Sequence, residues 1–180
     1  IAESKILSKL KLQSKNYILI TAHRSENVDN IEYFHRIIEA TGQIAKRFKC
    51  EVIYPMHPRT KSKLKNHEIS QGVRIIDPLG FYDFNHLLKE SYCVVSDSGT
   101  AAEEGIFYKV PNVSLRMATE RPETVESGAT IVSGMKLENI IESIETAVTL
   151  PWSAKYDFSD NHSPSSVVIN VIRSQITNFF

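Results

Sequence analysis

The sequence predicts an α/β fold, namely a Rossmann-like, doubly wound sheet whose strands are mostly parallel. Short apolar runs alternate with longer runs in which apolar side chains recur every three or four positions. Strands that alternate with helices favour right-handed βαβ units, which build a parallel sheet covered on both faces. The 180 residues, 42% of them hydrophobic, suffice for the core of one domain.

The first predicted elements are a strand, a long helix and a second strand. Residues 17–21, Tyr-Ile-Leu-Ile-Thr, form the apolar run of a buried strand. Residues 30–48 gather their apolar side chains on one helical face, and either Asn27 or Asp29 is available as the N-cap. Residues 51–56 then return to the pattern of a strand.

The remaining elements continue this alternation. A basic run predicts a short helix, and apolar runs alternate with helical patterns up to residue 148. A polar stretch then separates these elements from a last apolar periodicity that predicts a C-terminal helix. The predicted strands are 73–76, 92–96, 112–115 and 130–132, and the predicted helices are 59–66, 82–90, 101–107, a short one near Glu123, 137–148 and about 164–177.

Polar residues cluster where the predicted strands end. In parallel α/β sheets ligands bind outside the carboxyl ends of the strands. Two His, four Arg, several carboxylates and a Ser-Gly-Thr turn follow the strands, so we expect them on one rim of the sheet. These segments are 21–27 (Thr-Ala-His-Arg-Ser-Glu-Asn), 57–59 (His-Pro-Arg), 77–81, 97–100 and 116–123.

The segment Ser-Asp-Ser-Gly-Thr at 96–100 predicts a phosphate-binding turn. It joins an apolar strand to a helix, whose first N–H groups lack intrahelical partners and whose dipole attracts anions. The same residues also suit an ordinary N-cap and turn, and Glu103 and Glu104 would stabilise any first helical turn. This segment alone leaves both interpretations open. Likewise, His23 beside Arg24 suits a solvated loop, and Phe84 suits the core.

Composition argues against several classes of partner. Twenty-one basic residues balance twenty-one acidic ones, so no global field attracts nucleic acid or an anionic membrane. No apolar run approaches the length of a membrane span and no signal-peptide pattern opens the chain, so we expect a cytoplasmic protein. Cys50 and Cys93 are expected to be buried thiols. The histidine spacing does not suit zinc, and no glycine-rich loop supports NAD or ATP.

Four motifs occur in order: Thr-Ala-His-Arg-Ser-Glu-Asn (21–27), Asp-Pro-Leu-Gly-Phe-Tyr-Asp-Phe (77–84), Ser-Asp-Ser-Gly-Thr-Ala-Ala-Glu-Glu (96–104) and Arg-Met-Ala-Thr-Glu-Arg-Pro-Glu (116–123). Together they resemble the C-terminal half of the non-hydrolysing UDP-N-acetylglucosamine 2-epimerases, over nearly the whole chain. The resemblance implies that residues 1–180 are a C-terminal UDP-binding domain, one half of a two-domain arrangement like that of B-type glycosyltransferases. The N-terminal partner domain is then absent from this chain, which opens without a methionine.

The resemblance also assigns roles to individual positions. His23 matches a histidine near the diphosphate and the reacting sugar, and Arg121 matches an arginine that stabilises developing negative charge; these are the expected catalytic residues. Phe84 matches an aromatic position beside the uracil, and Glu104 matches a carboxylate that accepts hydrogen bonds from the ribose hydroxyls. The other expected substrate-binding residues are Arg24, His57, Ser98, Gly99 and Thr100, of which Ser98 and Gly99 match phosphate-binding positions.

The activity that this resemblance implies is the interconversion of UDP-N-acetylglucosamine and UDP-N-acetylmannosamine. UDP is eliminated to leave a 2-acetamidoglucal and is then added back with the opposite configuration, with no cofactor and no metal. In the family the carboxylates that act at C2 come largely from the N-terminal half, so we expect the isolated chain to be inactive. The expected partners are a UDP-N-acetylhexosamine, the N-terminal domain of the same polypeptide and a second copy in a homodimer, in bacterial surface-polysaccharide synthesis.

Several alternatives stay open. Many epimerases have Ser-Gly-Gly where this chain has Ser98-Gly99-Thr100. The Ser-Gly-Thr form resembles the subgroup that converts UDP-2-acetamido-2,6-dideoxy-L-talose to UDP-N-acetyl-L-fucosamine. A hydrolysing epimerase would release free N-acetylmannosamine, and a B-type glycosyltransferase would use the same fold. As an isolated fragment, the chain would be a non-catalytic UDP-sugar-binding module.

Overall fold

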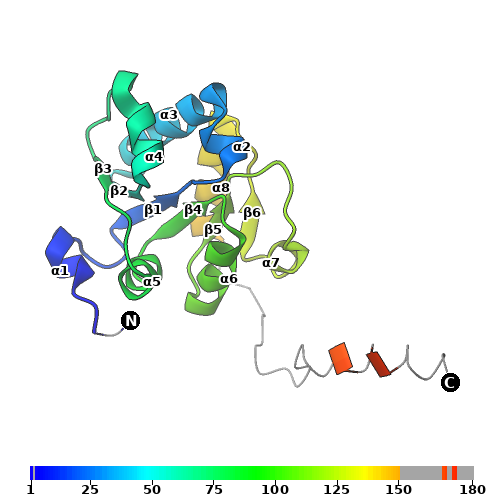
Figure 1. Cartoon of the computed structure of the whole chain (residues 1–180). Coiled ribbons are helices and arrows are strands. Elements are labelled where there is room, and N and C mark those ends of the chain that lie inside the picture. Colours follow the sequence, from blue (N-terminus) through cyan, green and yellow to red (C-terminus); the bar gives the residue numbers. More distant parts are fainter. Residues whose placement is uncertain (2, 151–167, 170–171, 174–180) are drawn as a thin grey trace.

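A six-stranded, entirely parallel sheet forms the centre of the molecule (Figure 1). The computed structural model describes residues 1, 3–150, 168–169 and 172–173. The strand order β3-β2-β1-β4-β5-β6 confirms the predicted doubly wound, Rossmann-like sheet. The strands are β1 (Tyr17–Thr21), β2 (Glu51–Pro55), β3 (Val73–Ile76), β4 (Cys93–Ser96), β5 (Asn112–Ser114) and β6 (Thr130–Val132).

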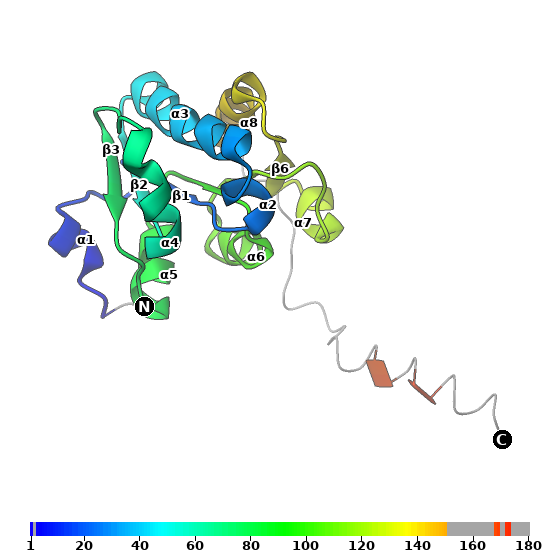
Figure 2. The same cartoon turned by 45° about the horizontal axis from the view of Figure 1, so that its top comes forward.

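Helices cover both faces of the sheet (Figure 2). Helices α3 and α8 pack on one face, and α1, α5 and α6 pack on the other. Short helical segments follow β1, β2 and β5. The helices are α1 (Ile6–Leu10), α2 (Ser25–Val28), α3 (Ile31–Phe48), α4 (Pro58–Lys61), the 3-10 helix η1 (Ser62–Asn66), α5 (Phe81–Lys89), α6 (Gly99–Tyr108), α7 (Pro122–Glu126) and α8 (Leu137–Thr149).

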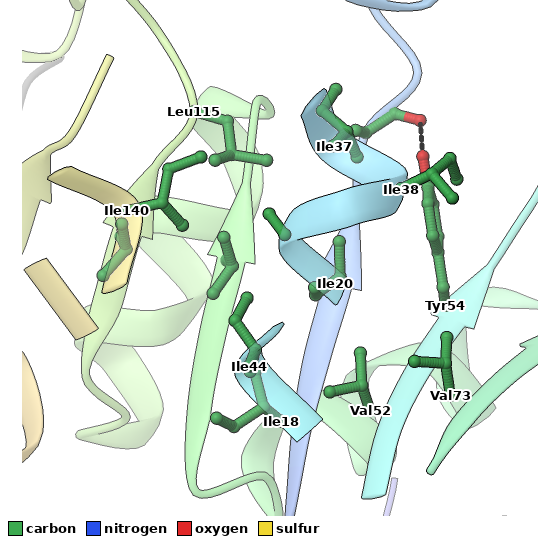
Figure 3. Packing of buried hydrophobic residues seen from close by; sticks show 14 of the residues in the cluster. Ile18, Ile20, Ile37, Ile38, Ile44, Val52, Tyr54, Val73, Leu115 and Ile140 are labelled. Atoms are coloured by element: carbon green, nitrogen blue, oxygen red, sulfur yellow. Dashed lines mark hydrogen bonds between the residues drawn. The ribbon is translucent and has the colours of Figure 1, made fainter. Parts of the chain in front are cut away.

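Strand β1 is buried on both faces and divides the core into two layers. Ile18 and Ile20 point towards α3, where they pack with Ile37 and Ile44 (Figure 3). Leu19, between them in sequence, joins the layer beneath α5 and α6. Alternate side chains point to opposite faces, so a central parallel strand is apolar throughout. Each of these buried aliphatic side chains contributes roughly 1.5–3 kcal/mol relative to exposure.

The direction of strand addition reverses between β1 and β4. From β1 the chain builds outward through β2 and β3, and it then returns to place β4 on the other side of β1. The loops after β1 and β4 therefore lead away in opposite directions, and parallel sheets of this type bind ligands at such a reversal point.

The structure corrects four details of the predicted elements. Asn30 caps α3 by accepting from the Tyr33 N–H at 3.1 Å, whereas the sequence favoured Asn27 or Asp29. Helices α1 and α2 were not predicted, and the basic run 59–66 divides into α4 and η1. Helix α6 begins at Gly99, two residues earlier than expected, so Glu103 and Glu104 lie beyond its first turn.

The remaining predictions agree with the structure where it describes them. Helices α5 and α8 match the predicted ranges to within one residue. Cys93 is buried, Cys50 is half-buried, and both are free thiols. The polar stretch and most of the predicted helix at 164–177 lie outside the described residues; 168–169 and 172–173 are helical. Within the described part of the chain, no helix is both long and apolar enough to cross a membrane.

Candidate functional site

Asp97 lies at the reversal point and joins the loops that follow three strands. It is fully buried directly after β4. Its carboxylate accepts from the backbone N–H groups of His23 and Arg24, which follow β1, at 2.9–3.2 Å. The amide of Asn27 donates to Asp97 at 3.0 Å and to the Leu115 carbonyl, after β5, at 3.2 Å. A buried carboxylate is stable only with such partners, so the three loops hold one geometry.

A cavity of about 440 Å³ opens at this edge of the sheet. Three of the predicted site residues line it: His23 after β1, His57 after β2 and Phe84 on α5. The structure therefore brings together residues 34 and 27 positions apart in the chain, because the carboxyl ends of parallel strands meet at one edge.

His57 and Phe84 also have structural roles. The His57 Nδ1 accepts from the Arg59 N–H at 3.2 Å, so this side chain is the N-cap of α4. Phe84 is half-buried and packs against the core layer beneath α5, which agrees with its partly structural interpretation. These contacts therefore hold both side chains in place where they line the cavity.

The N-terminus of α6 carries the predicted phosphate-binding turn. Ser98 is its N-cap: its hydroxyl accepts from the Ala101 N–H at a long 3.4 Å, and its own N–H donates to Ser96 Oγ at 2.9 Å. Gly99 and Thr100 occupy the first two helical positions, whose N–H groups have no carbonyl one turn earlier in the helix. Thr100 is exposed. The N-cap interpretation is confirmed, and it leaves the helix dipole directed at this edge.

Arg121, the N-cap residue of α7, lies against Gly99. A Cβ added to Gly99 would stand 3.5 Å from Arg121 Cγ, which is an ordinary contact, and Gly99 does not have a positive φ. Neither packing nor backbone conformation therefore requires glycine here. A missing side chain at a helix N-terminus does leave the backbone open to close approach by a ligand.

Two arginines converge on Glu120 in the loop after β5. The Arg24 Nη2 donates to Glu120 at 2.8 Å, and Arg116 forms an ion pair with the same carboxylate. The Arg116 side chain is only 13% exposed. The pKa of Glu120 lies below its ordinary value because of a backbone hydrogen bond and these two arginines. Arg24, a predicted ligand contact, therefore connects the loop after β1 to the loop that carries Arg121.

Glu104 lies on α6 where that helix meets α5. The Asn85 amide donates to its carboxylate at 3.3 Å, and burial raises the pKa of Glu104 above its ordinary value. Asn85 is itself buried and follows Phe84 directly. This contact holds the predicted ribose-binding carboxylate beside the helix that carries the predicted uracil-binding ring.

Sequence reasoning did not select three residues that organise this edge: Asp97, Asn85 and Arg116. Asp97 stood inside the phosphate motif, and its position directly after an apolar strand was the available signal. Burial of Asn85 and Arg116 depends on packing between helices and loops distant in sequence, which no local pattern reveals. Among the described residues, no group of three or more His, Cys, Asp or Glu is arranged to hold a metal ion.

Comparison with known proteins places this chain in one family. The family model described as UDP-N-acetylglucosamine 2-epimerase matches residues 1–170. A UDP-N-acetylglucosamine 2-epimerase of Methanococcus maripaludis is 33% identical over 174 residues, which cover 93% of this chain and 47% of that protein. The chain thus spans about half the length of the curated relatives that it matches.

Solved structures show the same fold. The crystal structure of the Methanocaldococcus jannaschii UDP-GlcNAc 2-epimerase in complex with UDP-GlcNAc and UDP superimposes with a TM-score of 0.80 at 32% identity, covering 96% of this chain and 49% of that one. A spinosyn rhamnosyltransferase shares the fold at 16% identity and a TM-score of 0.60, covering 79% and 39%. This confirms the predicted likeness to one half of a B-type glycosyltransferase. By its sequence over 170 residues and by its fold, the chain belongs to the UDP-N-acetylglucosamine 2-epimerase family.

Proposed function

We propose that this chain is the UDP-binding half of an enzyme that interconverts UDP-N-acetylglucosamine and UDP-N-acetylmannosamine. One observation carries the proposal: His23, which lines the cavity together with Phe84, is held by Asp97, the residue directly before the N-cap of α6, and Arg121 lies against Gly99 at that helix N-terminus. Membership of the epimerase family and the likeness to a relative solved with UDP-GlcNAc and UDP support it.

The diphosphate of UDP would bind at the N-terminus of α6. The Ser98 hydroxyl and the Gly99 and Thr100 N–H groups are donors there, and the dipole of α6 adds partial positive charge. Arg121 supplies a full positive charge beside them. This grouping suits a diphosphate, because hydrogen bonds from arginine or helix N–H groups to an ionised phosphate are stronger than hydrogen bonds between neutral groups.

The nucleoside would lie between α5 and α6. Phe84 presents an aromatic ring to the cavity, on which uracil can pack. Glu104, held by Asn85 on the neighbouring helix, would accept hydrogen bonds from the two ribose hydroxyls. Arg24 and His57 would border the ligand from the loops after β1 and β2.

Catalysis would follow from charge stabilisation of the leaving diphosphate. As the bond between C1 and its oxygen breaks, negative charge grows on UDP, and Arg121, His23 and the α6 N–H groups offset that charge. UDP then adds back to C1 of the resulting 2-acetamidoglucal while a proton is added to C2 on the face opposite to the one it left, and this addition inverts the configuration at C2. Proton transfer at C2 requires an acid and a base within hydrogen-bond reach, which we assign to a second domain of the same polypeptide.

The further features of the protein are parts of the same proposal. The active enzyme would combine this domain with its N-terminal partner, assemble as a homodimer and act in the cytoplasm. It would serve surface-polysaccharide synthesis in a bacterium, although the family also has archaeal members. The isolated chain would bind UDP without turning over the sugar.

Titration of the 180-residue chain with UDP by calorimetry tests the binding site. We expect one site per chain, and Phe84→Ala should weaken binding because the ring surface beside uracil is lost. Phe107→Ala, on the exposed far end of α6, is the aromatic control and should leave binding unchanged. No binding of UDP, or equal loss in both variants, would contradict the site.

NMR of the complete polypeptide with UDP-N-acetylglucosamine in D₂O tests the reaction. Deuterium at C2 of a sugar that still carries UDP supports the epimerase. Free N-acetylmannosamine plus UDP identifies a hydrolysing enzyme, and absence of exchange with this sugar but exchange with the 2,6-dideoxy-talose nucleotide identifies the other substrate. Transfer that depends on an acceptor would indicate a glycosyltransferase. Measurable epimerisation by the 180 residues alone would contradict the need for a second domain.

A further inference from the structure

We propose that Asp97 is a positioning residue that sets the tautomer of the His23 imidazole, holding the ring proton on Nδ1 and leaving Nε2 for the ligand. This inference rests on the proposed function in one respect, namely that His23 contacts the bound UDP-sugar. The geometry that carries it lies wholly within this chain. His23 is exposed at the cavity, with a side chain 57% accessible, and Asp97 behind it is completely buried.

The two oxygens of Asp97 have different surroundings. Oδ2 receives three donors: the His23 N–H at 3.0 Å, the Arg24 N–H at 2.9 Å and the Asn27 amide at 3.0 Å. Oδ1 shares the His23 N–H at 3.2 Å and faces the His23 Nδ1 at 3.5 Å. Oδ2 is therefore saturated, and Oδ1 keeps a lone pair directed at the imidazole.

This arrangement selects one tautomer of neutral His23. A carboxylate only accepts hydrogen bonds, so the ring nitrogen that faces Oδ1 is favoured when it carries the proton. The distance of 3.5 Å shortens to a hydrogen bond by a small rotation of an exposed side chain, as happens when a site closes on its ligand. A free imidazole in water has no such partner, so Asp97 imposes a preference.

The loop that carries His23 is fixed from two directions. Asp97 holds its N–H groups, and the buried Tyr54 hydroxyl donates to the Ala22 carbonyl at 2.7 Å (Figure 3). Tyr54 belongs to β2, and Asp97 follows β4, the two strands that flank β1. The backbone beneath His23 is therefore immobilised independently of its ring, and the ring orientation is the remaining freedom that Oδ1 controls.

The consequence concerns the nitrogen that meets the ligand. With the proton on Nδ1, the Nε2 of His23 carries a lone pair on the ring edge away from Asp97. A proton taken up by this imidazole then binds at Nε2 and is directed at the diphosphate, while the Asp97 carboxylate balances the new positive charge. In the other tautomer the lone pair of the His23 Nδ1 would face the Asp97 carboxylate, and the two would repel each other.

Asp97→Asn replaces the hydrogen-bond acceptor that faces His23 with a hydrogen-bond donor. Three donors converge on the Oδ2 position, so the amide oxygen of asparagine takes that place. Its NH₂ group then occupies the Oδ1 position and donates to the His23 Nδ1. The variant therefore changes few atoms, keeps the three strongest loop contacts, and is expected to move the His23 proton from Nδ1 to Nε2.

Two-dimensional ¹H–¹⁵N NMR of the imidazole ring in the 180-residue chain tests this inference. The spectra are recorded at about pH 8, above the ordinary histidine pKa of about 6.5, and the His23 signals are identified by their loss in His23→Gln. We expect the Nδ1–H tautomer to predominate in the natural chain and the Nε2–H tautomer in Asp97→Asn. Tyr54→Phe removes the other support of the loop and should leave the Nδ1–H tautomer in place.

Predominance of the Nε2–H tautomer in the natural chain would overturn the inference, even if Asp97→Asn does not fold. An Nδ1–H tautomer retained in a folded Asp97→Asn would overturn it as well, and a change of tautomer in Tyr54→Phe would assign the control to the loop rather than to Asp97. The spectra need no UDP. Failure of UDP to bind while His23 has the expected tautomer would contradict the proposed function alone, and normal UDP binding with the other tautomer would contradict this inference alone.

Discussion

Arg121 donates from Nε to the Glu103 carboxylate at 2.6 Å, which joins the N-cap of α7 to the exposed side of α6. This hydrogen bond and ion pair raise the pKa of the guanidinium above its ordinary value, so Arg121 stays charged at any physiological pH. The pair holds Arg121 against Gly99 at the helix N-terminus. A diphosphate that binds there must therefore share this arginine with Glu103 or take it over.

Glu103→Gln should increase the affinity for UDP. The substitution removes a negative charge beside the anion site and weakens the hold on Arg121, and both changes favour the diphosphate. We expect a several-fold lower Kd by calorimetry, with a larger effect at low salt because the pair is exposed. Glu39→Gln on the exposed side of α3 is the charge-matched control and should leave the Kd unchanged. An unchanged or higher Kd in Glu103→Gln would show that Glu103 positions Arg121 rather than competing for it.

Arg121→Ala should lower the kcat of the complete polypeptide by about two orders of magnitude or more, the usual cost of losing a preorganised group that stabilises charge in the transition state. Arg121→Lys keeps the charge but loses the planar fork, so an intermediate rate is expected. Steady-state turnover of UDP-N-acetylglucosamine checks both variants. Turnover near that of the natural enzyme in Arg121→Ala would remove this residue from the active site.

Substitutions of Ser98 separate its two roles. Ser98→Ala loses the cap of α6, at a cost of about 1 kcal/mol in stability, and also a donor to phosphate, at a cost of about 1–2 kcal/mol in UDP binding. Ser98→Asp keeps a good N-cap but adds a negative charge beside the diphosphate. We therefore expect Ser98→Asp to retain its Tm and to bind UDP far more weakly, as judged by thermal unfolding and titration. If both variants keep their affinity for UDP, Ser98 only caps α6 and does not bind the diphosphate.

Glu104→Gln should stabilise the free chain at neutral pH and weaken UDP binding. Burial raises the pKa of Glu104 in the folded state above its unfolded value, so the folded state binds a proton more readily. The ionised carboxylate therefore costs stability above the folded pKa, and this cost disappears as the pH falls below the unfolded pKa. Thermal unfolding should show a higher Tm for Glu104→Gln than for the natural chain at about pH 7 and no difference near pH 4. A lower Tm at neutral pH would mean that the contact with Asn85 outweighs burial.

Lys49→Gly should stabilise the fold. Lys49 ends α3 in the left-handed conformation, with φ at 50°, where a side chain costs about 1 kcal/mol that glycine avoids. Lys46→Gly, within the same helix, should destabilise by about 1 kcal/mol, because glycine is a poor helix former. Urea unfolding of the two variants measures the free energy of unfolding, which should rise in Lys49→Gly and fall in Lys46→Gly. Loss of stability in Lys49→Gly would mean that the lysine side chain has contacts that compensate for its backbone strain.

Local pattern predicted the strands and the long helices well. A strand such as β1 is buried on both faces, and such burial leaves a continuous apolar run in the sequence. The amphipathic period of α3 and α8 has the same origin, because each helix buries one face against the sheet. The start of α6 was predicted less accurately, because its N-cap is Ser98 and the helix begins at Gly99, inside the Ser-Gly-Thr turn.

The chain order of strands and polar segments also determined which edge of the sheet carries the site. Strand ends of parallel βαβ units meet at one edge whatever the intervening residues are, so His23, Ser98 and Arg121 could be assigned there from the sequence. Tertiary structure alone decided how these groups are held. Asp97 contacts residues more than seventy positions away, Glu104 is held by Asn85 from another helix, and Arg121 is paired with Glu103 across a loop. Such contacts depend on the angle and distance at which loops leave the sheet, and those are fixed by packing of the whole core rather than by any local run of residues.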